Sequence, residues 1–175
     1  MALLDRLLGR RATDDRAPVR PLWHKVVATA RHREWYADSG VADTLAGRFD
    51  MVTAVLCLVL LRMERDEALI SPSVLLTELF VEDMDGQLRE IGVGDLVVGK
   101  HMGKLMGTLG GRLGAYREAL GIEEDEALAK AVRRNVTLAE ADKAPAVAAQ
   151  LRALAQELSA VPAERFLDAA LGEAA

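Results

Sequence analysis

The most regular pattern of apolar positions lies between residues 49 and 63. Its members recur at intervals of three and four: Phe49, Val52, Leu56, Val59, Leu60 and Met63. Met51, Val55 and Leu58 widen this stripe until most of the segment is apolar. An α-helix brings positions three and four apart to one face, so the pattern predicts a buried central helix near residues 49–63.

Shorter apolar stripes, several of them opened by proline, predict the helices around this one. One helix is expected from about Pro21, and another from Ser71-Pro72, where serine would cap the helix and proline would take its first position. A charged junction from Asp83 to Gly92 would follow that second helix. Further helices are expected at 94–120, 123–135, 145–159 and 162–171, and Gly110-Gly111 could break the first of these.

No segment shows sustained alternation of apolar and polar residues, which a half-buried strand would require. The predicted fold is therefore all-α, a single-domain bundle of roughly seven to nine helices, with a buried central helix near 49–63 and a long glycine-rich helix near 94–120. A chain of 175 residues is long enough for one domain of ordinary size. We expect an N-terminal helix and loop at 1–17, a core at 18–135 and C-terminal helices at 136–175.

Composition agrees with a globular protein, because hydrophobic residues make up 51% of the chain and charged residues 28%. The net charge of −5 argues against a protein whose main task is to neutralise a nucleic-acid backbone, so no DNA partner is expected. The single cysteine, Cys57, lies within an apolar run, which indicates a buried thiol in a reducing compartment. No apolar run reaches the ~20 residues needed to span a bilayer, so we expect a soluble protein.

The first eleven residues, "MALLDRLLGRR", form a separate amphipathic pattern. Four leucines share one helical face and three arginines lie elsewhere: Leu3, Leu4, Leu7 and Leu8, with Arg6, Arg10 and Arg11. The segment is too short and too charged for a secretory signal. It is expected to be either a docking helix or a weak membrane-surface contact.

The stretch from Gly94 to Lys100 matches the Gly-x-x-x-x-Gly-Lys frame of a phosphate-binding loop. His101 stands where that loop needs a hydroxyl for magnesium, and the preceding residues are charged where a buried strand is required. A nucleotide-binding enzyme that uses this segment is therefore the least favoured function. The histidines and Cys57 lack the spacing of metal ligands, and no catalytic motif is present, so neither a catalytic site nor a cofactor or metal is expected.

Glycines recur on one side of the predicted helix at 94–120. Gly99, Gly103 and Gly107 are spaced by four, and Gly110 and Gly114 fall within ~80° of them at 100° per residue. The result is a face without side chains, flanked by Met102 and Met106 among other apolar residues and, on its other side, by Lys100, Lys104 and His101. Two interpretations remain open: tight packing against a helix of the same chain, or a groove for an apolar helix of a partner.

Three stretches resemble the ubiquinol–cytochrome c chaperone family. They are "WYADSGVADTLAGRFDM" at 35–51, "LFVEDMDGQLREIGVGDLVVGKHMGKLMG" at 79–107 and "GRLGAYREAL" at 111–120. Short strings such as Gly47-Arg48-Phe49 and Gly92-Val93-Gly94-Asp95 are specific as a set and in this order. The chain departs from the family at Leu109-Gly110, where an aromatic residue usually precedes the Gly-Arg pair.

The resemblance implies an assembly factor for respiratory complex III and not an enzyme. Mitochondrial members of the family bind newly made cytochrome b, together with a small partner protein near the ribosomal exit, before cytochrome b enters complex III. For this chain, which looks like a bacterial relative, the resemblance implies cytochrome b or another complex III subunit as client. It also implies a small co-chaperone and the ribosome as further partners, and a cytoplasmic location with at most peripheral contact with the inner membrane.

A charged set accompanies the matching stretches, and it could tie helices together through ion pairs or present a polar rim to the client. With the glycine face and two residues of the third stretch, it completes the candidate partner-binding residues: Gly99, Lys100, Met102, Gly103, Lys104, Met106, Gly107, Arg48, Asp83, Asp85, Arg89, Glu90, Asp95, Arg112 and Tyr116. The alternative function is a ribosome- or RNA-associated adaptor protein. Such an adaptor would bind through Arg10, Arg11, Lys100 and Lys104, and its affinity would fall steeply with salt.

Overall fold

The structure, a computed structural model, describes residues 14–90 and 95–171. Within these ranges, the side chains of residues 88–90, 95–102 and 169 lie outside the description. The predicted amphipathic segment at the N-terminus also lies outside the described residues.

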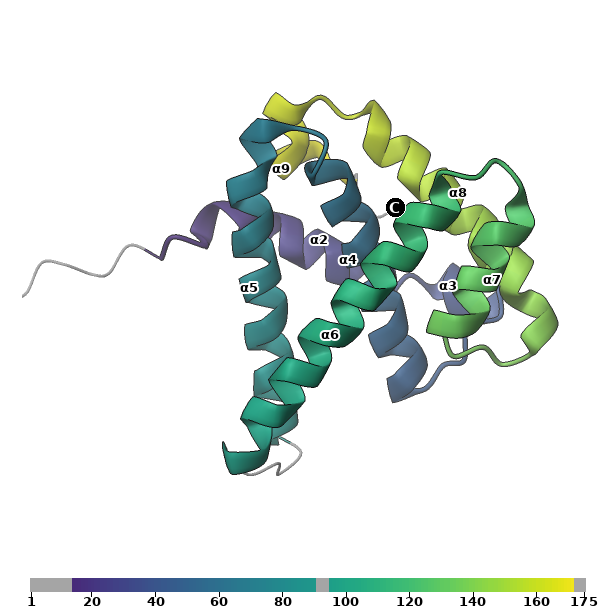
Figure 1. Cartoon of the computed structure of the whole chain (residues 1–175), viewed down its shortest axis with the longest axis horizontal. Coiled ribbons are helices and arrows are strands. Elements are labelled where there is room, and N and C mark those ends of the chain that lie inside the picture. The colour runs from purple at the N-terminus through teal and green to yellow at the C-terminus, as the bar shows by residue number, and fades with distance from the viewer. Residues whose placement is uncertain (1–13, 91–94, 172–175) are drawn as a thin grey trace, which may run out of the picture.

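The described residues form α-helices joined by short turns (Figure 1). In chain order they are η1 (Ala17–Val19), α2 (Arg20–Ala30), α3 (Arg33–Ala37), α4 (Leu45–Met63), α5 (Glu67–Glu90), α6 (Asp95–Leu120), α7 (Asp125–Asn135), η2 (Ala141–Lys143), α8 (Ala144–Ala160), η3 (Ala163–Arg165) and α9 (Phe166–Ala169). The described part of the chain has no sheet and only an isolated antiparallel bridge between Val41 and Leu138. This confirms the predicted all-α fold.

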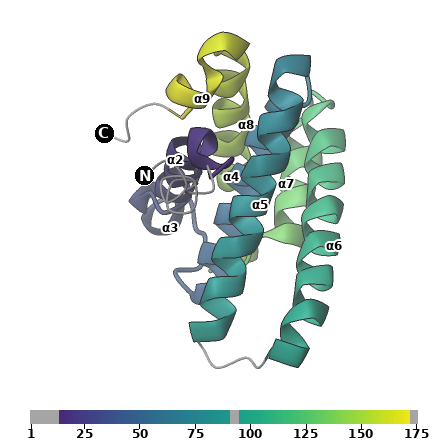
Figure 2. The same cartoon turned by 90° about the vertical axis from the view of Figure 1, so that its left-hand side faces the viewer.

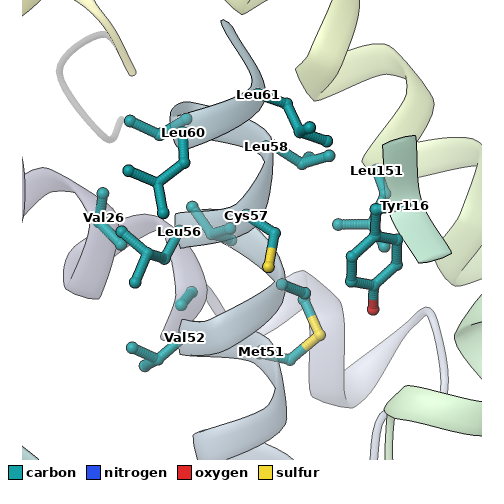
Figure 3. Close-up of a cluster of buried hydrophobic side chains, with 14 of the residues drawn as sticks. Val26, Met51, Val52, Leu56, Cys57, Leu58, Leu60, Leu61, Tyr116 and Leu151 are labelled. Atoms are coloured by element: carbon teal, nitrogen blue, oxygen red, sulfur yellow. The ribbon is translucent and has the colours of Figure 1, made fainter. Parts of the chain in front are cut away.

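Helix α4 is the centre of the molecule, and α2, α6 and α8 pack around it. Every residue from Met51 to Leu61 is buried, which confirms the predicted central helix. Figure 3 shows Val26 beside Leu56 on one side of α4, and Leu151 and Tyr116 on the other. The helix begins earlier than the predicted Phe49, because the Thr44 hydroxyl accepts a hydrogen bond from the Gly47 amide at 3.1 Å and caps the first turn.

Helix α5 differs from the prediction at both ends. It begins at Glu67, and not at Ser71-Pro72, because an Asp66 carboxylate oxygen accepts a hydrogen bond from the Ala68 amide at 3.1 Å. Pro72 therefore lies inside the helix. The Ala68 carbonyl that proline leaves without a helical donor belongs to an exposed residue, so water can satisfy it. The predicted junction at 83–92 is also wrong up to Glu90, because α5 continues through its charged residues.

Helices α5 and α6 lie side by side on one flank of the molecule (Figure 2). Helix α6 runs unbroken through Gly110-Gly111, so the break considered there does not occur. The face of α6 opposite these glycines packs against the core through Leu109, Tyr116 and Ala119, which are buried. This packing offsets the poor helix propensity of the glycines. Among the described residues, no helix has both the length and the apolar character needed to cross a membrane.

The C-terminal end contains less helix than predicted. Only the single turns η3 and α9 form within the expected segment 162–171. Phe166 is fully buried, and the Arg62 guanidinium lies over its ring at 5.2 Å from the centroid. Ala170 is also buried, and Leu167 packs against the core, so the segment is held by a few apolar contacts around Phe166 and not by a long helix.

Candidate partner-binding site

Helix α6 turns its glycine face toward solvent. Gly103, Gly107, Gly110 and Gly111 are exposed, and Gly114 is half-buried. A Cβ atom added at any of these five positions would have no described atom within 4 Å outside the local helix backbone. We call these five residues the glycine strip. Packing against a helix of the same chain, one of the two interpretations of the pattern, therefore does not explain them within the described residues.

The orientation of the strip follows from the opposite side of α6. Leu109, Tyr116 and Ala119 are buried, and Leu105 and Leu113 are packed against the core from half-buried positions. These residues lie about half a helical turn away from the glycines at 100° per residue. Because α6 packs on α4 through this apolar face, the strip must face outward.

Two exposed side chains border the strip. Lys104 lies on one flank, and Met106, with 42% of its surface exposed, lies on the other. The arc between them that contains the glycines is about 160° wide, so this part of the α6 surface carries no side chains. An unbranched methionine can adapt to an apolar partner, and a lysine can keep its charge in water at the edge of a contact.

On the Met106 side, the surface continues into a groove between α5 and α6 with a volume of about 750 Å³. We call it the α5–α6 groove. Its lining combines apolar, hydroxyl and charged residues: Arg16, Ser73, Val74, Thr77, Glu78, Val81, Glu82, Asp85 and Met106. The glycine strip and the α5–α6 groove therefore form adjoining parts of one outer face. Asp85, a predicted site residue, lines this groove, whereas Asp83 is exposed on α5.

Arg48, another predicted site residue, belongs to a different place. Its Nε lies 2.7 Å from an Asp43 carboxylate oxygen, and this guanidinium holds the pKa of the Asp43 carboxyl below its usual value. Together with Arg31, Arg33 and Tyr36 these two residues border a separate hollow beside the start of α4. The structure does not bring Arg48 to the α5–α6 groove.

Arg112 points inward and forms a buried ion pair. Its Nη2 donates to Asp50 Oδ1 at 2.6 Å, and the guanidinium lies 5.6 Å from the centroid of the Phe49 ring. The backbone N–H and the hydroxyl of Thr137 donate to Asp50 Oδ2 at 2.9 and 2.7 Å. Only 7% of Asp50 is exposed. The pair joins α4, α6 and the segment after α7, so Arg112 has a structural role in this conformation.

Asp50 was not among the predicted residues. A signal was present in the sequence, because a carboxylate directly before a largely apolar run must be paired if it is buried. Its partner, however, lies 62 positions away, and no spacing rule connects the two.

Tyr116, another predicted site residue, is fully buried and presents no surface to a partner in this structure. Its ring lies beside Cys57 and Met51 of α4 (Figure 3). Burial raises the pKa of Tyr116 above its ordinary value. Burial also raises the pKa of the Cys57 thiol to about 12, so the sulfur is protonated at neutral pH.

The remaining predicted residues have side chains outside the description: Gly99, Lys100, Met102, Arg89, Glu90 and Asp95. Backbone structure nevertheless bears on the phosphate-loop match. Lys100 lies within α6, and the element that precedes residues 91–94 is the helix α5. A phosphate-binding loop requires a buried strand there, so the nucleotide hypothesis lacks its structural context. No cluster of potential metal ligands occurs among the described residues.

The fold and this outer face define a class of protein. It is an all-α protein with a buried hydrophobic core and, on its surface, a strip of glycines beside the α5–α6 groove. The model of the family described as "Ubiquinol-cytochrome C chaperone" matches residues 37–173. The chain belongs to this family, which confirms the resemblance seen in the sequence. The match begins at the end of α3 and includes α8 and the turns that follow it.

A solved structure supports the same assignment. The chain is similar to the "Cbp3 homolog from Brucella abortus", whose crystal structure it matches with a TM-score of 0.80 and 32% sequence identity. The match covers 98% of this chain and 96% of that chain. No curated protein matches the sequence. Membership of the family implies a role in the assembly of complex III.

Proposed function

We propose that this protein is a non-catalytic assembly chaperone that binds newly made cytochrome b, or a similar apolar subunit, during assembly of the ubiquinol–cytochrome c reductase complex. The observation that carries the proposal is the family match over residues 37–173, together with the likeness of nearly the whole chain to a solved family structure. The family description supports a complex III subunit as client. A small co-chaperone and the ribosome as further partners are part of the proposal.

The glycine strip is the part of the surface best suited to an apolar helix. Each glycine costs a helix up to ~1 kcal/mol relative to alanine, and the described chain gains no close contact in return. Helices that meet through small residues can bring their backbones close together, which is how many helices of membrane proteins associate. A helix of the client laid along the strip would obtain this close approach.

The borders of the strip suit the same kind of client. Met106 offers an adaptable apolar contact on one side, and the α5–α6 groove extends that apolar surface through Val74 and Val81. Lys104 on the other side can remain in water or meet a charged group at the end of a membrane helix. The face therefore combines an apolar centre with a polar rim, as protein interfaces do.

The pKa values and hydrogen bonds of the buried polar side chains support a non-catalytic role. Burial raises the pKa values of Cys57 and Tyr116, which is the wrong direction for a nucleophile at neutral pH. Both carboxylate oxygens of Asp50 accept hydrogen bonds, from Arg112 and Thr137. The proposal includes a cytoplasmic location, with at most peripheral contact with the inner membrane.

Copurification from a membrane-containing extract tests the proposal. Tagged wild-type protein should enrich cytochrome b or another complex III subunit, and deletion of its gene should lower the level of complex III. Gly107→Leu, which fills the strip at an open position, should reduce the enrichment. Gly86→Leu fills an equally open position on α5 outside the strip and should not. The proposal is wrong if no complex III subunit is enriched and the deletion leaves complex III at its normal level.

A further inference from the structure

The α5–α6 groove leaves large apolar side chains exposed. Val74 is 54% exposed and Met106 42%, and both line the groove. Ile70, which is 45% exposed, precedes Val74 by about one turn of α5. Apolar residues gathered in a hollow usually mark a contact with another segment or another molecule.

The described chain begins beside this groove. Arg16 lines it, and Arg16 Nη1 lies 2.8 Å from Glu82 Oε2 on α5. Asp14 is held nearby by Arg20, whose Nη2 lies 2.6 Å from Asp14 Oδ2. Residues 1–13 are therefore tethered next to the groove, at a high effective concentration for any contact with it.

Residues 1–13 carry a complementary apolar pattern. Leu3, Leu4, Leu7 and Leu8 would lie within an arc of about 140° if the segment were helical. Residues 3–11 would then span about 13 Å, and the part of α5 from Ser73 to Asp85 that lines the groove spans about 18 Å. The segment is thus short enough to lie within the groove.

The charges of the two surfaces are also complementary. Glu78 and Glu82 lie four positions apart on the α5 wall of the groove. In a helical segment, Arg6 and Arg10, also four positions apart, would lie along one edge of the leucine face. The ion pair of Arg16 with Glu82 already shows an arginine from this end of the chain bound to that wall.

We propose that residues 1–13 dock as an amphipathic helix into the α5–α6 groove of the same molecule. The leucine face meets Val74, Val81 and Met106, and the arginine edge meets Glu78 and Glu82. This contact lies within the chain and forms without the client, although a client helix that reached Val74, Val81 and Met106 would compete with the docked segment for them. It covers apolar surface that is exposed in the described part of the molecule.

Cysteine labelling of the full-length chain tests this docking. Val74→Cys places a thiol in the groove at an exposed position, whereas the native Cys57 is buried and protonated. Its rate of reaction with a maleimide is compared with the rate in a chain that also carries Leu4→Asp and Leu7→Asp. If about nine tenths of the molecules are docked, the aspartates should accelerate labelling about tenfold. Leu45→Cys, at a position 75% exposed and outside the groove, is the matched control and should react equally in both chains.

Two outcomes would overturn the proposal. Equal labelling of Val74→Cys with and without the aspartates would show that the segment does not cover the groove. Protection that disappears on hundredfold dilution would show that the segment docks on a second copy of the chain. Intramolecular docking requires protection that depends on the leucines and is independent of protein concentration.

Discussion

Replacing the exposed glycines of α6 by alanine should stabilise this protein. We consider the variant with Gly103, Gly107, Gly110 and Gly111 all changed to alanine. Because no described atom outside the local backbone lies within 4 Å of the added methyl groups, the substitutions create no overlap. Each alanine should contribute ~0.5–1 kcal/mol through lower unfolded-state entropy and better helix propensity. The four together should therefore add about 2–4 kcal/mol to the free energy of unfolding.

Urea unfolding followed by circular dichroism measures this gain. With a slope of about 2 kcal/mol per molar urea, the midpoint should rise by about 1–2 M, and the melting temperature should rise by several degrees. Gly47→Ala is the opposite control, because its Cβ would lie 2.0 Å from the Ala42 carbonyl oxygen. That variant should lose more than about 2 kcal/mol. A fall in the midpoint of the four-alanine variant would refute the reasoning, because it would show that other atoms of the chain pack against the strip.

The four-alanine variant should have opposite effects on the stability of the fold and on the binding of the client. Four methyl groups would hold a client helix away from the backbone of α6, so client capture should weaken although the fold becomes more stable. Gly86→Ala, at an open position on α5, should also raise stability but leave capture unchanged. If the four-alanine variant captures the client as well as the wild type, the strip is not the contact surface.

Three further predictions concern the core. Asp50→Ala should lower the free energy of unfolding by about 3 kcal/mol in urea, because it leaves Arg112 without its carboxylate, while Asp50→Leu with Arg112→Met should lose less. Tyr116→Phe should be neutral or stabilise by up to ~1 kcal/mol in the same assay, because the buried hydroxyl has no hydrogen-bond partner among the described residues. Burial raises the pKa of Cys57 to about 12, whereas the pKa of an unfolded cysteine is about 8.5. The contribution of the protonated thiol to the free energy of unfolding is therefore complete below about pH 8.5 and declines as the pH rises toward 12. Urea midpoints should therefore fall above about pH 9, and they should fall less steeply in Cys57→Ala.

The long helices could be predicted from the sequence because each carries a dominant local pattern. The stripe at 49–63 lies within α4, and the segment 94–120 corresponds to α6, which begins at Asp95. The errors occurred where local signals competed. Ser71-Pro72 is a good start for a helix, but Leu69 is buried in the core and Asp66 caps the helix earlier, so tertiary packing moves the boundary.

The site was less predictable, because periodicity shows which residues share a face but not which way the face points. Helix α6 has an apolar face and a glycine face, and either could have packed on α4. The buried ion pair shows the same limit, since Arg112 looked like an accessible cation until its partner in α4 was known. Only the three-dimensional structure distinguishes a charge that is committed to the core from one that is free to meet a partner.

The outward orientation of the glycine strip is therefore stronger evidence for a binding role than the presence of the glycines in the sequence. If these glycines allowed α6 to approach a neighbouring helix of the fold, their low helix propensity would be offset inside the molecule and would say nothing about function. They instead lie on the outer surface, next to Met106 and the α5–α6 groove, where an added Cβ has no described atom within 4 Å outside the local helix backbone. Alanine at the same positions would give a more stable helix with the same internal packing. We propose that these glycines serve a partner that approaches α6 from outside the described fold, and an apolar helix would use them most directly.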